Sequence, residues 1–153
     1  MSGYSFVVPG PPTGKGRPRF VRATGRAYTD KQTVLAENNI LWAWREAGQG
    51  RINDGPVTVL VEAVFERPQS HRLRSGALSA VGARSSSPTK KPDADNLLKA
   101  ALDALNGHAW RDDAQVVNAT VIKRWAYPTD NRSHVRIAVW PGEYADRSVE
   151  LAA

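Results

Sequence analysis

The sequence predicts an α/β (α+β) fold: a single domain with a mixed β-sheet of about four strands and two main helices. Strand-like and helix-like segments alternate along the chain, and 153 residues are enough for one hydrophobic core without cross-links. The clearest strand spans residues 57–65, where both faces are largely apolar, as in a strand at the centre of a sheet. The clearest helix spans residues 95–105. Its expected core-facing residues are Leu98, Ala101, Leu102 and Leu105.

The first third of the chain is expected to hold one strand, a basic arm and one helix. Residues 4–8 are β-prone and end in a proline-rich stretch that cannot continue a strand. Residues 13–26 are rich in glycine and arginine and are interpreted as a basic arm. A helix is expected to begin at Thr29 or Asp30 and to end at Gly48, although its apolar face is ragged.

The rest of the chain adds a long loop and two strands. Residues 67–92 hold six Lys and Arg but no Asp or Glu, and form a basic loop or arm of a length that is usually functional or disordered. Strands are expected at residues 115–125 and 134–140, joined by a turn at 128–131. A flexible tail is expected from about residue 142.

Basic residues outnumber acidic ones in this chain. Lys and Arg total 21 and Asp and Glu 15, which gives a formal net charge of +6. This balance favours a polyanionic partner such as nucleic acid, but a merely soluble basic protein explains it equally well. Cysteine is absent, which excludes disulfides and thiolate zinc sites and favours a reducing, cytoplasmic compartment. The first residues do not resemble a signal peptide and no apolar run approaches the ~20 residues of a membrane span, so no membrane partner is expected.

A compact acidic cluster is the most informative feature of this basic sequence. Asp93 and Asp95 introduce the helix at 95–105, and Asp112 and Asp113 follow that helix by a short loop. In extended chain, Asp93 and Asp95 project to one side about 6–7 Å apart, and Asp112 and Asp113 are expected to supply the opposite wall. Carboxylates bind hard divalent cations, whereas Lys and Arg bind phosphate. The pattern therefore predicts metal-dependent chemistry on nucleic acid.

Each residue of the cluster also has a structural explanation. Asp95 suits a helix N-cap, a role that stabilises by about 1 kcal/mol. Lys99 lies four residues later and can be its solvated partner, and Asp112 and Asp113 suit a turn. These structural roles are favoured for each residue taken alone, and only the joint arrangement in a basic chain favours a functional site.

Two stretches of the sequence resemble the RusA family of Holliday junction resolvases. The first comprises KPDADNLLKAALDAL at residues 91–105 and WRDDAQVV at 110–117. The second, VPGPPTGKGRPR at residues 8–19 with Tyr28 and Thr29, is similar to the opening of that family. Together these stretches span most of residues 4–140 in order.

The resemblance implies a RusA-like fold and a homodimeric, magnesium-dependent endodeoxyribonuclease. Such an enzyme nicks two opposed strands of a four-way DNA junction during recombination and repair, in the cytoplasm of a bacterium or as a phage product. Mn2+ is expected to substitute for Mg2+, and no small-molecule cofactor is expected. The resemblance implies catalytic and metal-binding roles for Asp93, Asp95 and Asp113, a catalytic role for Lys99, an optional metal-binding role for Asp112 and a structural role for Asp103.

The basic segments are expected to contact DNA phosphates rather than base edges. The residues assigned to this role are Lys15, Arg17, Arg19, Arg72, Arg74, Arg84, Lys90 and Lys91. Two features depart from the family pattern. The arm that ends at Lys91 is long, and no aromatic wedge stands beside the aspartates, because Lys90 and Lys91 occupy those positions. The element that opens the junction is therefore not identified by the sequence.

Other interpretations stay open. A structure-selective nuclease acting on forks or flaps keeps the aspartates, and a non-catalytic junction-binding protein keeps only the basic surface. The intact acidic set disfavours the non-catalytic protein, and a panel of DNA substrates separates the two nucleases. A nucleotide-binding P-loop is excluded, because the spacing from Gly10 to Gly16 is one residue short and Gly16 stands where Ser or Thr is required.

Overall fold

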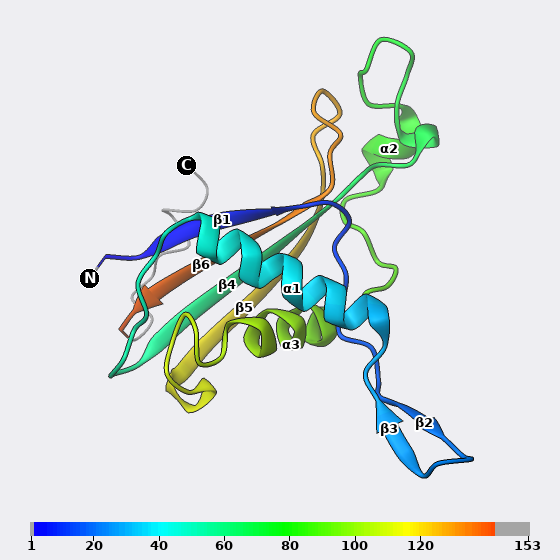
Figure 1. Ribbon diagram of the computed structural model, residues 1–153. Coiled ribbons are helices and arrows are strands. Elements are labelled where there is room, and N and C mark those ends of the chain that lie inside the picture. The colour runs from blue at the N-terminus through cyan, green and yellow to red at the C-terminus, as the bar shows by residue number, and fades with distance from the viewer. Residues whose placement is uncertain (1, 143–153) are drawn as a thin grey trace.

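Four strands form the mixed sheet at the centre of the molecule (Figure 1). The structure is a computed structural model and describes residues 2–142. The strands β1 (Tyr4–Pro9), β6 (His134–Pro141), β4 (Val57–Phe65) and β5 (Val116–Trp125) lie side by side in that order. β6 runs antiparallel to both β1 and β4, whereas β4 and β5 are parallel. The predicted mixed α/β fold with a four-stranded sheet is confirmed.

β4 is a central strand because its side chains are apolar on both faces. Val57, Val59 and Val61 point to one face and are buried, while Leu60 and Val64 are buried on the other. β6 and β5 flank it through antiparallel and parallel pairing, respectively. A strand with two neighbours has no free edge, and the continuous apolar run is typical of this position.

Two helices cover one face of the sheet (Figure 1). α1 (Lys31–Glu46) and α3 (Ala94–Leu105) lie close to the predicted bounds. α3 buries Leu97 and Leu105 together with three alanines, whereas the predicted core residues Leu98 and Leu102 are only partly buried at its margin. The small alanine side chains let α3 approach the sheet and α1 closely, so the buried stripe is centred on them.

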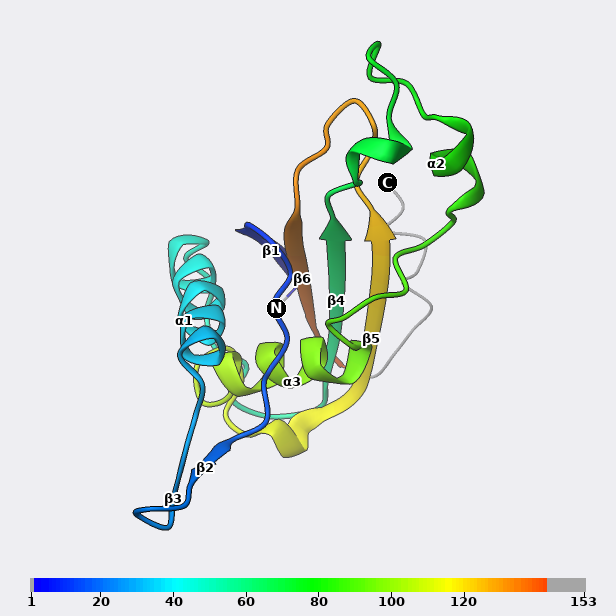
Figure 2. The same cartoon turned by 90° about the vertical axis from the view of Figure 1, so that its right-hand side faces the viewer.

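A β-hairpin that the sequence did not predict projects from the base of α1 (Figure 2). It consists of β2 (Arg19–Val21) and β3 (Arg26–Tyr28), and all six strand residues are exposed. The predicted basic arm at residues 13–26 is therefore partly regular. Alternation between buried and exposed faces is the main signal of a strand, and a hairpin with no buried face does not carry it.

Residues 67–92 form a folded lobe, and they contain two short helices where a loop or arm was expected. The lobe contains η1 (Gln69–His71) and α2 (Ala80–Arg84) and stands above the carboxyl ends of β4 and β5 (Figure 1). His71 is buried, and its ring packs edge-on against the Trp125 ring, with 5.1 Å between the two ring centroids. The lobe is thus anchored to β5 by contacts between residues far apart in sequence.

The tail expected from about residue 142 lies, beyond Gly142 itself, outside the described residues. Among residues 2–142, no helix is both long and apolar enough to cross a bilayer.

Candidate functional site

The first turn of α3 presents two carboxylates to solvent. Asp93 is the N-cap residue with an extended backbone, while Asp95 already lies inside the helix. The expectation that both residues lie in extended chain is therefore wrong for Asp95. Within the described chain, the Asp93 side chain accepts no capping hydrogen bond, so its carboxylate does not cap the N-terminus of α3. Negative charge is favourable at a helix N-terminus, which stabilises this exposed acidic pair.

Lys99 lies one turn further along the same face of α3. Its Nζ is 3.8 Å from Asp95 Oδ2, and both side chains are more than half exposed. The predicted stacking of Lys99 over Asp95 is confirmed. An exposed ion pair of this kind contributes at most about 1 kcal/mol to stability, so the ammonium is free to turn toward an arriving phosphate.

Asp112 and Asp113 lie at the opposite end of α3. The backbone N–H of Asp113 donates to Oδ1 of Asn106, the residue that ends α3, at 3.1 Å. α3 has 12 residues, which corresponds to about 18 Å at 1.5 Å per residue. The expectation that these aspartates form the opposite wall of the Asp93–Asp95 site is wrong within one chain. Across residues 2–142, no three acidic or histidine side chains gather closely enough to hold a metal ion.

The two aspartates after α3 have different local environments. Asp112 accepts a hydrogen bond from the Ala114 N–H at 2.8 Å and forms a capping box with Gln115, so it starts the short helix η2 (Asp113–Gln115). Asp113 accepts a hydrogen bond at 2.8 Å from the indole N–H of Trp110, which is fully buried. The Trp110 contact fixes the orientation of Asp113, whereas Asp112 has the turn role that its residue type favours.

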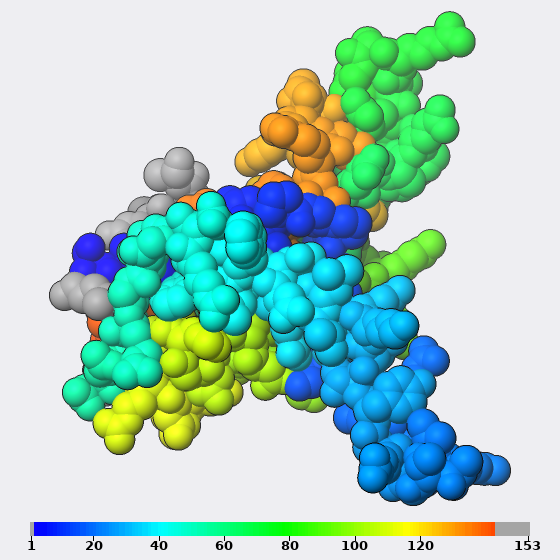
Figure 3. All heavy atoms as spheres, viewed as in Figure 1, coloured from blue at the N-terminus to red at the C-terminus, as the bar shows by residue number. Residues whose placement is uncertain are grey.

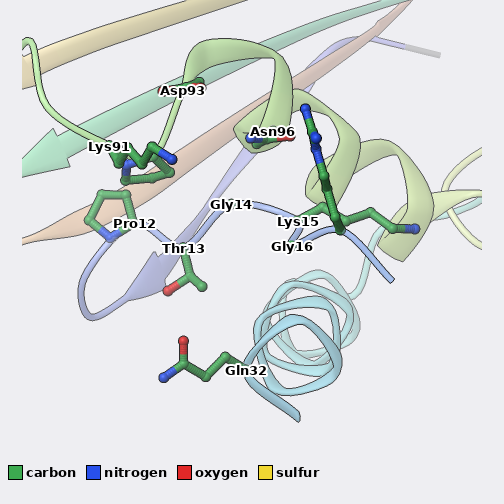
Figure 4. Close-up of a pocket in the computed structure, with 11 residues that line it drawn as sticks. Pro12, Thr13, Gly14, Lys15, Gly16, Gln32, Lys91, Asp93 and Asn96 are labelled. Carbon is green, nitrogen blue, oxygen red and sulfur yellow. The ribbon is translucent and has the colours of Figure 1, made fainter. Parts of the chain in front are cut away.

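An open groove of about 780 Å³ runs past the start of α3 (Figure 4). One wall is the N-terminal segment 12–17, which we call the strap, and the other includes Lys91, Asp93 and Asn96. Gln32 of α1 contributes to the floor (Figure 4). Cationic and carboxylate side chains therefore share one groove, as expected where a phosphate backbone passes a carboxylate site.

Two glycines allow the strap to pass between α1 and α3. A Cβ on Gly14 would lie 2.9 Å from Cβ of both Asn96 and Pro92, so a side chain does not fit there. The next residue is held by a hydrogen bond from its N–H to the Asn96 carbonyl oxygen at 2.9 Å. The N–H of Gly16 donates to Oγ1 of the buried Thr33 at 2.9 Å. The strap is thus fixed beside Asp93 by backbone contacts.

Lys15 joins the strap to both helices. Its ammonium is paired with Asp103 of α3 and lies 3.6 Å from Oε1 of Glu37 on α1. The hydrogen bond to Asp103 is the main reason that the pKa of Lys15 is raised above its usual value. Lys15 stays charged and holds the strap in place. Its predicted contact with DNA stays a prediction, and Asp103 lies where a structural role is expected.

The other residues predicted to bind DNA divide among three places. Arg17 and Lys91 line the groove, and Arg19 lies in the hairpin. Arg72, Arg74 and Arg84 are exposed on the lobe, and Lys90 lines a second hollow of about 580 Å³ beneath it. Figure 1 shows the lobe and the hairpin projecting on the same side of the molecule, with the start of α3 between them.

The sequence did not point to several exposed residues of the hairpin. Arg22 and Arg26 were not assigned to DNA contact, and neither were the exposed aromatic residues Phe20 and Tyr28. A usable signal was present in the sequence, because Gly25 stands between two short β-prone runs; in the structure it takes a positive φ of 64°, as a hairpin turn requires.

Comparisons with known proteins place the chain in a family. The family model described as "Endodeoxyribonuclease RusA" matches residues 9–139. The crossover junction endodeoxyribonuclease RusA of Shigella sonnei (strain Ss046) is 31% identical over 131 residues, which cover 80% of this chain and 84% of that protein. The uncharacterized protein YqaN of Bacillus subtilis (strain 168) is 31% identical over 126 residues, which cover 80% of this chain and 88% of YqaN.

Proposed function

This chain belongs to the RusA family of endodeoxyribonucleases, and we propose that it resolves four-way (Holliday) DNA junctions by paired symmetric nicks. Its nuclease activity follows from the family, and the Shigella relative is named for crossover junctions. The observation that carries the proposal is the exposed Asp93–Asp95 pair at the start of α3, which lies beside a groove lined by cations.

The proposal includes dependence on Mg2+, with Mn2+ as a substitute. Asp93 and Asp95 suit a hard cation, because both are exposed and Asp93 accepts no capping hydrogen bond within the described chain. Of the three carboxylates that the family resemblance implies, Asp93 lines the groove and Asp95 lies beside it in the first turn of α3, whereas Asp113 of the same chain lies beyond the other end of that helix. A bound ion would activate water and neutralise charge on the scissile phosphate.

The groove and Lys99 perform the remaining parts of the proposed chemistry. Arg17 and Lys91 hold the DNA backbone along the groove, so that a phosphate comes to rest at the start of α3. Lys99, which is only weakly held by Asp95, turns toward that phosphate and offsets the negative charge that develops during hydrolysis.

A homodimer completes the proposal. Asp113 lies about one helix length from Asp95, so one chain does not bring both to the same phosphate. In a two-fold symmetric dimer, Asp113 of a second copy can face the Asp93–Asp95 pair of the first. The dimer also presents two identical sites to a two-fold symmetric junction, as paired nicking requires.

The decisive experiment compares wild type with Asp95→Asn on a mobile four-way junction in Mg2+. We expect the variant to lose cleavage while its junction binding stays equal or becomes tighter, because a negative charge near phosphates is removed. Asp54→Asn is the matched control, since this aspartate is exposed and lies outside the groove. Wild-type cutting rates in the Asp95→Asn variant contradict the catalytic assignment.

The dimer is tested by complementation between two inactive variants. A mixture of Asp95→Asn and Asp113→Asn subunits forms heterodimers in which one composite site keeps both carboxylates. We expect this mixture to nick a single strand, whereas neither variant alone cuts. An inactive mixture contradicts the shared site, and a monomer in sedimentation that is fully active on junctions contradicts the dimer.

A broader nuclease acting on forks or flaps is the alternative function. Fork, flap, linear duplex and four-way substrates are cut in parallel under one set of Mg2+ and salt conditions. We expect the four-way junction to be cut at least ten-fold faster than the fork. Equal cutting rates on forks and junctions would favour the broader activity over junction resolution.

A further inference from the structure

The β2–β3 hairpin is the most exposed regular element of the described chain. Arg19 pairs with Tyr28, Phe20 with Ala27, and Val21 with Arg26. The turn is closed by a hydrogen bond from the Gly25 N–H to the Val21 carbonyl oxygen at 2.9 Å. Figure 3 shows the hairpin standing clear of the sheet and helices. An isolated two-stranded hairpin is only marginally stable in water. Because neither face of this hairpin is buried in the protein, we ask which partner could bind to it.

The pairing register separates the hairpin side chains into two faces. Arg19, Val21, Arg26 and Tyr28 share one face, because side chains alternate along a strand. Phe20 occupies the other face, and its cross-strand neighbour is the small Ala27. Phe20 is 65% exposed and Tyr28 is 48% exposed. A large aromatic ring is thus presented to solvent without a cross-strand partner of its own size.

The charge around Phe20 selects the kind of partner. Residues 13–29 carry five cations (Lys15, Arg17, Arg19, Arg22 and Arg26) and no carboxylate. Two copies of such a hairpin repel each other, whereas a polyanion is attracted to both. Aromatic rings flanked by arginine are the usual platform for unstacked bases, with the cations on neighbouring phosphates. The partner that fits is therefore a nucleic acid with unpaired or easily unstacked bases.

The root of the hairpin lies beside the carboxylate groove. Gly16 is tied to Thr33 of α1, and the strap is tied to Asn96 of α3. Phe20 is four positions after Gly16, which limits their separation to about 14 Å in extended chain. This distance corresponds to roughly four nucleotides at 3.4 Å each. Phe20 can therefore act on the same DNA, a few nucleotides from the phosphate at Asp93.

We propose that the hairpin is the element that opens the junction, with Phe20 as an aromatic wedge that stacks on an unpaired base at the branch point. Arg19, Arg22 and Arg26 hold the phosphates that flank this base. The inference rests on the proposed junction function, and it supplies the aromatic element that is absent beside the aspartates. Wedges of this kind partially unstack a base step in exchange for extra contact with the protein.

The test is a four-way junction that carries the fluorescent base 2-aminopurine at its branch point. Binding is measured in the uncut complex with Asp95→Asn, and the Phe20→Ala change is added to that background. We expect a several-fold rise in fluorescence on binding, because the base leaves its stack, and its loss with Phe20→Ala. The same change should weaken junction binding roughly ten-fold and leave linear duplex binding unchanged.

Two further variants make the result specific. Phe20→Trp restores an aromatic surface, so it is expected to recover the fluorescence rise and junction cleavage. Leu35→Ala removes an apolar side chain of α1 with a similar exposure of 61%, and we expect it to change neither. Thermal unfolding of each variant shows that the loss does not arise from a collapsed fold.

Three outcomes separate the possibilities. If wild type cuts junctions and Phe20→Ala leaves fluorescence, binding and cleavage unchanged, the wedge role is overturned but the proposed function is not. If Phe20→Ala sediments as a monomer and loses linear duplex binding as much as junction binding, the hairpin is a contact between subunits. That result also overturns the wedge role. Wild type that neither binds nor cuts four-way junctions overturns the proposed function itself.

Discussion

Two segments of this chain have the same charge pattern and different structures. Residues 13–29 and residues 67–92 are both rich in Lys and Arg and free of Asp and Glu. The first becomes a strap and an exposed hairpin, whereas the second folds into a lobe on the ends of β4 and β5 (Figure 1). Every arginine of the hairpin and its turn is exposed, but the lobe uses one of its arginines to hold itself together.

Arg67 illustrates the difference. Its Nε donates to the carbonyl oxygen of Ala126 at 3.0 Å, and its guanidinium lies 5.8 Å from the centre of the Trp125 ring. The backbone of Arg67 also exchanges hydrogen bonds with the Asn131 side chain. A cation in a basic segment can therefore serve the fold rather than a polyanion, and only its contacts tell which. Four predictions test this distinction, and they are ordered by the size of the effect we expect.

The triple variant Arg19/Arg22/Arg26→Ala is expected to give the largest effect. Removing three phosphate contacts should flatten the slope of log K against log[salt] by about 2.7 units and weaken junction binding several hundred-fold near 0.1 M salt. Titrations at several salt concentrations measure both. An unchanged slope shows that the hairpin does not lie on the DNA backbone.

The lobe provides the matched comparison. Lys90/Lys91→Ala removes one cation from the hollow beneath the lobe and one from the groove, and should flatten the slope by about 2 units on all junction sequences. If Lys90/Lys91→Ala has no effect while the triple hairpin variant has the full effect, DNA binding is restricted to residues 13–29.

Arg67→Ala is expected to act on stability instead. Loss of its hydrogen bonds and its contact with Trp125 should lower the free energy of unfolding by about 2 kcal/mol and leave the salt slope unchanged. Urea denaturation measures the first quantity. Arg72→Ala is the control, because that side chain is exposed and forms no ion pair within the described residues, so a change below about 0.5 kcal/mol is expected. The opposite pattern, a flatter slope with unaltered stability, contradicts the structural role of Arg67.

Asp103→Asn is expected to have the smallest effect. It removes one carboxylate from Lys15, but the ion pair is partly exposed and the strap keeps its backbone contacts to Asn96 and Thr33. We expect the free energy of unfolding to fall by less than about 1 kcal/mol. Junction cleavage, measured beside wild type, should fall less than three-fold. A loss above ten-fold shows that this ion pair, rather than the glycine-mediated packing, positions the strap.

The order and type of the main elements were predictable from the sequence. β4 carries a continuous apolar run and α3 a periodic apolar pattern, and both signals depend only on residues within a few positions of each other. The same local pattern identified Lys99 as the neighbour of Asp95, because residues four apart share one face of a helix. The acidic cluster and the basic segments beside it were equally visible, as was the resemblance to the RusA family.

The placement of the acidic residues was decided by the tertiary structure. Asp95 and Asp113 are close in sequence, but α3 and the loop after it form a rigid spacer that keeps them apart. The indole of Trp110 then fixes Asp113 at that far end. Sequence spacing does not give this separation, because it depends on how the turn after the helix packs.

The fates of the two basic segments were also decided by contacts over long sequence separations. The sequence by itself determined that both are cationic and free of carboxylates. Only the tertiary structure placed His71 against Trp125 and left Phe20 exposed beside the small Ala27. Burial depends on what the rest of the chain brings to a segment, so two segments of similar charge end as a lobe packed against β5 and as an exposed hairpin.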